Sequence, residues 1–180
     1  MKKLHLLLHD LMLALGIAAP GKAGAMEAIA KELNAYHESI IVLDTKSKKT
    51  CNIEGQVKDY QNHLDAQLRS LGIADDEKSG LAAVLLITSQ NFAIAGSHCV
   101  LHVELSFQTR IPPEMFTRLT DAQQAALNRI GSLPVSVWNA SAMAVAPLLQ
   151  PSAGGESDMA QKAVIRLIDA IVDLLRTQRQ

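Results

Sequence analysis

The chain has no long hydrophobic run and almost no net charge. A membrane-spanning helix needs about 20 consecutive apolar residues, and no stretch of the 180 residues supplies them. The 17 basic and 18 acidic side chains leave a formal net charge of −1, which gives no electrostatic reason to bind a nucleic acid. We therefore expect no stable membrane span and no nucleic-acid partner.

Cysteine is also scarce, with Cys51 and Cys99 far apart in the sequence. Two cysteines are too few for a disulfide-based scaffold. In an oxidising compartment they could pair, whereas a buried free thiol is the commoner state of an isolated cysteine. The sequence leaves both alternatives open.

No metal-binding or phosphate-binding motif stands out. The segment His98-Cys99-x-x-His102 resembles a ligand cluster, but in a strand its two histidines lie about 13 Å apart and Cys99 points to the other face. The glycines at 16, 21 and 24 belong to the amino-terminal segment and form no phosphate-binding loop. We expect no metal and no cofactor.

The sequence shows no pattern of catalytic side chains either. Cys51 would need a nearby base to act as a nucleophile, and His63 lies about three turns along the following helix. Asp75-Asp76-Glu77 lacks the alternating ligands of a calcium loop. The sequence therefore predicts no catalytic residue.

The first 25 residues carry the most information. They begin with Lys2 and Lys3, continue with an apolar run from Leu11 to Ala19, and end with Ala23-Gly24-Ala25. This order is typical of a signal peptide, so we expect cleavage after Ala25 and a single α/β domain over residues 26–180. The alternative is an amphipathic amino-terminal helix.

Hydrophobic periodicity predicts three main helices. A short one covers 26–36, and a longer one follows Asn52, with apolar residues every three or four positions up to Leu71. Gly72 and Ile73 are the residues expected after its carboxyl end. The last helix follows a Gly/Ser/Pro-rich link, 151–155, and Ser157 can cap it. An irregular or helical excursion lies within 111–132, with Asp121 near a helix start and Gly131 after its end.

Four segments have the pattern of strands. Residues 40–43 are a continuous apolar run, which predicts a strand buried on both faces, and the almost wholly apolar run 82–88 predicts a central strand. Residues 98–110 alternate, with apolar side chains from Cys99 to Phe107 on one face. A short strand follows at 135–138. The order β-α-β-β-β-α predicts a two-layer α/β sandwich, a mixed sheet with helices mainly on one face.

The opposite face of that sheet is the candidate interaction surface. The alternation directs to it His98, His102, Glu104, Ser106, Gln108, Arg110 and, from its own strand, Trp138. An exposed tryptophan beside polar groups is a good contact anchor. The alternative is that the polar residues are merely solvated and Trp138 packs under the 111–132 excursion.

The chain resembles a group of small, uncharacterised exported proteins of Gram-negative bacteria. The resemblance lies in Ile40 to Asp44, Leu64 to Ile73, His102 to Leu105, Val137-Trp138-Asn139 and the amphipathic last helix. Its element order is similar to that of the amino-terminal domain of the periplasmic protein TolB, a protein-interaction module. The 111–132 excursion is longer here than in that group.

These features predict a periplasmic, non-enzymatic module that binds an envelope protein or its own copy. It would do so through the open sheet face or an exposed strand edge. The alternative is a small-ligand binder or hydrolytic enzyme that uses His98, His102 and Glu104 on that face, which requires them to converge in a pocket.

Overall fold

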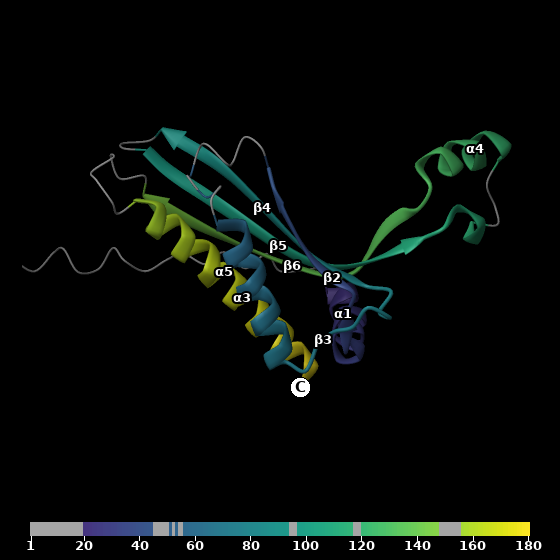
Figure 1. Ribbon diagram of the computed structural model, residues 1–180, viewed down its shortest axis with the longest axis horizontal. Helices are drawn as coiled ribbons and strands as arrows, with labels where there is room; N and C mark the ends of the chain where they lie inside the picture. Colours follow the sequence, from purple (N-terminus) through teal and green to yellow (C-terminus); the bar gives the residue numbers. More distant parts are fainter. Residues whose placement is uncertain are drawn as a thin grey trace, which may run out of the picture.

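The fold consists of one mixed sheet with helices on one side (Figure 1). The computed structural model describes residues 20–44, 51, 53, 56–93, 97–116, 120–147 and 156–180, with the backbone alone at 20–23, 90–93, 97, 98, 146, 147 and 156–159. In chain order the elements are α1 (Pro20–Glu32), β1 (Ala35–Tyr36), β2 (Glu38–Leu43), α3 (Val57–Ser70), β3 (Ala74–Asp75), β4 (Ala82–Ala93), β5 (Ser97–Ile111), the 3-10 turn η2 (Pro113–Met115), α4 (Asp121–Ile130), β6 (Leu133–Pro147) and α5 (Glu156–Arg179).

The main sheet has the strand order β2-β4-β5-β6. Strands β2 and β4 are parallel, whereas β5 is antiparallel to both of its neighbours. β1 and β3 form a separate parallel pair. The predicted two-layer α/β sandwich with a mixed sheet is confirmed.

The alternation of strand β5 produces the centre of the core. Its five apolar side chains, Cys99, Leu101, Val103, Leu105 and Phe107, are all completely buried. Paired residues of neighbouring strands share a face, so the register also directs Ala83, Leu85 and Ile87 of β4 inward. One face of the sheet is therefore the core face, as predicted.

Helices α3 and α5 lie side by side on that core face (Figure 1). Each presents an apolar stripe to the sheet, which includes Leu64 and Leu68 of α3 and Ile168 and Ile171 of α5, all buried. At the rim of this helix pair, His63 Nε2 donates to Asp169 Oδ1 at 2.7 Å and Gln67 Nε2 donates to the same oxygen at 3.1 Å. These two contacts join α3 to α5.

Helix α3 ends as the sequence predicts. Gly72 has a φ of +75°, a left-handed conformation that glycine adopts without steric cost. Its N–H donates to the carbonyl of Arg69, and the N–H of Ile73 donates to that of Leu68, the two hydrogen bonds of a Schellman motif. The amino-terminal boundary differs, because the helix begins at Val57 and Ile53 is buried ahead of it.

Three other predicted boundaries are wrong. Helix α1 ends at Glu32 and Tyr36 belongs to β1, because the chain turns there to pair with β3. Helix α5 begins one residue before Ser157. Strand β6 extends nine residues past the predicted end at Trp138, through a segment rich in alanine, which has a low strand propensity when taken alone.

The alanines of β6 allow helix α5 to approach the sheet. Ala140, Ala142 and Ala144 are paired with the core residues Leu105, Val103 and Leu101 of β5, so they share the core face. Their small side chains leave room for the stripe of α5, which contacts both β5 and β6. Packing against a helix, rather than intrinsic propensity, therefore accounts for this part of the strand.

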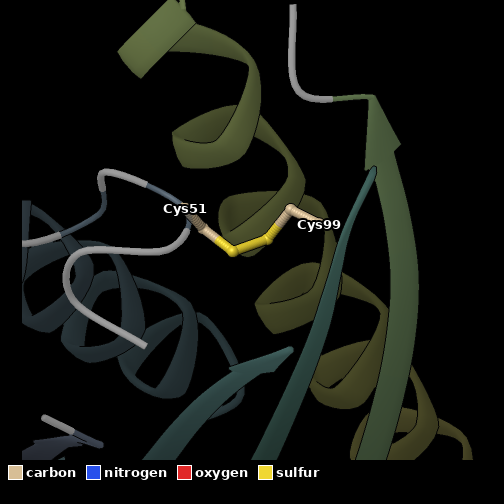
Figure 2. The surroundings of a disulfide bond; sticks show 2 residues. All are labelled: Cys51 and Cys99. Atoms are coloured by element: carbon tan, nitrogen blue, oxygen red, sulfur yellow. A yellow bond between two sulfur atoms is a disulfide. The ribbon is translucent and has the colours of Figure 1, made fainter. Parts of the chain in front are cut away.

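Cys51 and Cys99 form a disulfide (Figure 2). Their Cα atoms are 5.9 Å apart across a sequence separation of 48 residues, and both cysteines are buried. The bridge joins the segment ahead of α3 to strand β5. Of the two alternatives that the sequence left open, the structure contains the paired one.

The amino-terminal prediction falls partly outside the described residues, which begin at Pro20. Helix α1 runs through the predicted cleavage position. The side chains described here that pack on the core all follow Ala25 in the sequence. They are Met26, Ile29 and Ala30 of α1, and Leu33 just after its end. In the part of the chain that the structure describes, no helix combines the length and apolar character that crossing a membrane requires.

The location of the core on one face of the sheet leads to a first test. Replacing Ile171 or Leu68 by alanine should lower the free energy of unfolding by about 2–5 kcal/mol, because each leaves a cavity between helix and sheet. Alanine at His102 or Gln108, on the other face, should cost less than about 0.5 kcal/mol. Denaturant unfolding of the four variants measures both. Equal losses for His102→Ala and Ile171→Ala would show that the second face is also core.

Candidate interaction surface

The open face of the sheet, on the side away from α3 and α5, carries most of the predicted surface residues. His102 and Glu104 of β5 are half-buried there, Gln108 is similar, and Arg110 is exposed. Ser106 belongs to the same row but is almost fully buried, at 4% exposure. The side chain of His98 lies outside the described residues.

Trp138 does not belong to this surface, and its predicted exposure is wrong. It is 1% exposed, and its ring meets that of Phe107 edge to face at 5.9 Å between centroids. Its Nε1–H donates to Gln178 Oε1 of α5 at 2.9 Å. The indole is thus part of the core, with its one polar atom paired.

A β-bulge explains this error. Phe107 pairs with Trp138, but the next residue, Gln108, pairs with Ser136, so Val137 is an extra residue in β6. Strict alternation fails across such an insertion. Trp138 therefore shares the core face with Phe107, although counting from Val135 places it on the other side.

The open face is more apolar than strand β5 alone indicates. The register places Ile40 and Val42 of β2, Val84 and Leu86 of β4, Val100 of β5, and Met143 and Val145 of β6 on it. Val42 is 41% exposed, Met143 42% and Val145 53%. We call these seven side chains the open-face patch.

Sequence reasoning missed this patch because it took β2 as buried on both faces and β4 only as a central strand. That prediction is wrong for the second face: α3 and α5 cover only one side of the sheet (Figure 1). The sequence nevertheless held a signal for this patch. Strands β2 and β4 carry apolar residues on both sides, and the long helices cover only one face of the sheet, so apolar surface remains exposed on the other face.

The other exposed apolar side chains lie on a projecting arm, formed by η2, α4 and the strand ends 109–111 and 133–135. Figure 1 shows the β5–β6 hairpin carrying α4 away from the other helices. Pairing continues to Ile111 opposite Leu133, which holds the arm. Of its residues, Met115 is 69% exposed, Ile130 63% and Val135 36%.

Local interactions define helix α4. Thr120 and Gln123 form a capping box at its start, in which Thr120 Oγ1 accepts from the N–H of Gln123, and Gly131 ends it with a φ of +85°. This matches the helix predicted between Asp121 and Gly131. None of its side chains is buried, so the capping interactions at its two ends, and not packing on the core, define this helix.

The side chains considered for catalysis on the open face, His102 and Glu104, are not joined by any hydrogen bond that the structure shows. Both thiols are engaged in the disulfide, and Thr88 Oγ1 lies 3.4 Å from His102 Nδ1. His102 and Glu104 are two residues apart on one strand, about 7 Å. Among the residues that the structure describes, no three potential metal ligands gather.

A polar cavity of about 370 Å³ lies elsewhere, lined by Tyr36, Asp65, Arg69, Ala74 and Asp75. Tyr36 Oη donates to Asp65 Oδ1 at 2.9 Å. Burial, and then the Asp65 carboxylate, raise the pKa of Tyr36 above its usual value. None of the predicted surface residues lines this cavity.

Comparison with known proteins gives weak similarities only. No protein-family model and no curated protein sequence matches the chain. A dodecameric PelC variant from Paraburkholderia phytofirmans is 11% identical, with a TM-score of 0.37 over 92% of this chain and 95% of that one. A minor lipoprotein from Acinetobacter baumannii is 14% identical, with a TM-score of 0.28 over 79% and 91%. Neither structure is TolB, so that similarity stays a prediction.

Proposed function

We propose that this protein is a non-enzymatic interaction module of the bacterial periplasm that binds a protein partner through the open face of its sheet. The observation that carries the proposal is the open-face patch. Isolated exposed apolar residues are ordinary, whereas several apolar side chains that share one face with a few polar groups are typical of protein-binding surfaces.

The composition of the open face suits a contact between folded proteins. Apolar side chains of β2 and β4 lie on one side of strand β5, and Met143 and Val145 of β6 lie on the other. Between them stand His102 and Glu104, which can give a partner its orientation through hydrogen bonds. Protein interfaces combine apolar contacts with a few polar groups that set specificity.

The periplasmic location is supported by two independent features. Residues 1–25 have the pattern of a signal peptide, and the buried disulfide is a bond that persists in oxidising compartments and is rare in the cytosol. The predicted partner, an envelope protein or a second copy, would be met in the same compartment.

The alternative, a hydrolytic enzyme or small-ligand binder on the open face, has less support. His102 and Glu104 stand on a sheet surface, and the described cavity lies at other residues. Within that cavity the phenol of Tyr36 already donates to the carboxylate of Asp65.

Site-specific photo-crosslinking tests the proposal. A photoreactive amino acid at Val145, on the open face, should give a crosslinked adduct in intact cells, and the adduct should fractionate with the periplasm. The same amino acid at Ala66, exposed on α3, is the control and should give none. Adducts of equal yield from both positions, or none from position 145, would contradict the assignment of this face.

A further inference from the structure

The polar cavity of about 370 Å³ lies at the carboxyl end of helix α3, where the small sheet of β1 and β3 packs beside it. Asp65 and Arg69 are four residues apart on α3 and therefore lie on one face of that helix. Tyr36 of β1 is paired with Asp75 of β3, so these two side chains share one face of the small sheet. One helix face and one sheet face thus line the cavity.

The cavity contains three charged groups that do not neutralise one another. Asp65 and Asp75 contribute carboxylates, and Arg69 contributes a guanidinium. In the part of the chain that the structure describes, Arg69 forms no ion pair, and the one hydrogen bond of its side chain runs from Nε to the backbone carbonyl of Asp65, at 3.2 Å. The terminal nitrogens of the guanidinium therefore stay available for a carboxylate, which binds them in a forked geometry.

Both carboxylates also keep free acceptor atoms. Tyr36 Oη donates to Asp65 Oδ1 at 2.9 Å, and among the described residues no other donor reaches the Asp65 carboxylate and none reaches that of Asp75. Burial has the largest effect on the pKa of Tyr36 and raises it, Asp65 and Asp75 raise it further, and Arg69 lowers it. All three charges therefore lie near one buried phenol, where a single small molecule can contact them together.

We propose that this cavity binds a free basic α-amino acid such as lysine. At neutral pH lysine carries two ammonium groups and one carboxylate, which complement the two carboxylates and one guanidinium of the cavity. A ligand with cations alone would leave Arg69 without a partner, and an acidic ligand would be repelled by Asp65 and Asp75. Ligand cavities measure about 300–1,000 Å³, so the volume suits a small molecule.

The number of charges favours a free amino acid over the end of a peptide. A lysine at the carboxyl terminus of a peptide has its α-amino group in an amide bond, and a lysine at the amino terminus has lost its carboxylate. Each would leave one charged group of the cavity without a partner. The site lies apart from the open face, so this inference goes beyond the proposed protein binding and does not depend on it.

Titration of the isotope-labelled full chain with lysine, followed by two-dimensional NMR, tests the proposal. Lysine should shift the amide signals of the residues that line the cavity, with a dissociation constant of about 0.1–1 mM, because each exposed ion pair contributes little. Three analogues lack one charge each: norleucine lacks the side-chain ammonium, Nα-acetyl-lysine the α-ammonium, and cadaverine the carboxylate. Each should bind about fivefold more weakly than lysine.

Variants connect the charges of the ligand to those of the cavity. Arg69→Gln should weaken lysine binding by about fivefold without weakening cadaverine binding, so the preference for lysine over cadaverine should disappear. Asp75→Asn should weaken lysine binding to a similar extent. Arg166→Gln on α5 and Glu114→Gln on η2 remove the same charges from exposed positions outside the cavity, and they should leave the affinity for lysine unchanged.

The opposite results are equally clear. Absence of any shift at about 10 mM lysine, or shifts confined to residues outside the cavity, would overturn the proposal. Cadaverine bound as tightly as lysine by the unmodified chain, or equal losses in the control variants, would do the same. None of these results bears on crosslinking at position 145, so failure of the amino-acid site and failure of the proposed function are distinguishable.

Discussion

Replacing Trp138 by alanine should lower the free energy of unfolding by about 3–5 kcal/mol. The indole is fully buried against Phe107, and its removal leaves a large cavity at the bulge where β5 and β6 change register. It also leaves Gln178 without its hydrogen-bond donor. Since a domain of this size is stable by only about 5–15 kcal/mol, this single change should remove a substantial part of the total.

Urea unfolding followed by far-ultraviolet circular dichroism measures the loss. Trp138→Phe keeps an aromatic ring and loses the N–H, so it should cost about 1–2 kcal/mol. Met143→Ala, on the open face of the same strand, is the matched control and should cost less than about 0.5 kcal/mol. If Trp138→Ala behaved like Met143→Ala, the tryptophan would be a surface residue after all.

Removal of the disulfide should have an effect of similar size. Closing a loop with a separation of 48 residues corresponds to about 4 kcal/mol of lost chain entropy in the unfolded state. The double variant Cys51→Ala, Cys99→Ala should therefore unfold at a lower denaturant concentration than the unmodified chain by that amount of free energy. The segment ahead of α3 should also lose its link to β5 (Figure 2).

A reductant provides the control for this prediction. Dithiothreitol should destabilise the unmodified chain to the level of the double variant, and it should leave the double variant unchanged. Mass spectrometry after alkylation counts the thiols that become free. Equal stability of the oxidised and reduced chains, with both thiols alkylated, would show that the bridge contributes nothing to the fold.

Local signals account for what sequence reasoning predicted correctly. The alternation from Cys99 to Phe107 specifies a strand with one apolar face, because successive side chains point to opposite sides. The glycines at 72 and 131 mark helix ends because each takes a positive φ, which glycine adopts without steric cost. The apolar stripes of α3 and α5 require a surface to cover, and these patterns together predict a two-layer fold.

Contacts between distant segments decided the rest. The side of the sheet on which Trp138 lies depends on a bulge that exists only when β6 pairs with β5. The pairing of Cys51 with Cys99 depends on two segments 48 residues apart meeting in the core. The strand character of residues 139–147 depends on α5 packing over alanines that have little strand propensity of their own.

The candidate surface shows the same division. The sequence by itself determined which side chains of β5 point away from the core, because strand periodicity is local. The polarity of that face depended on which side chains of β2, β4 and β6 lie beside those of β5, and on which faces of the sheet the helices cover. Only the tertiary structure decided this, since cross-strand register and layer packing bring together residues that no local pattern connects.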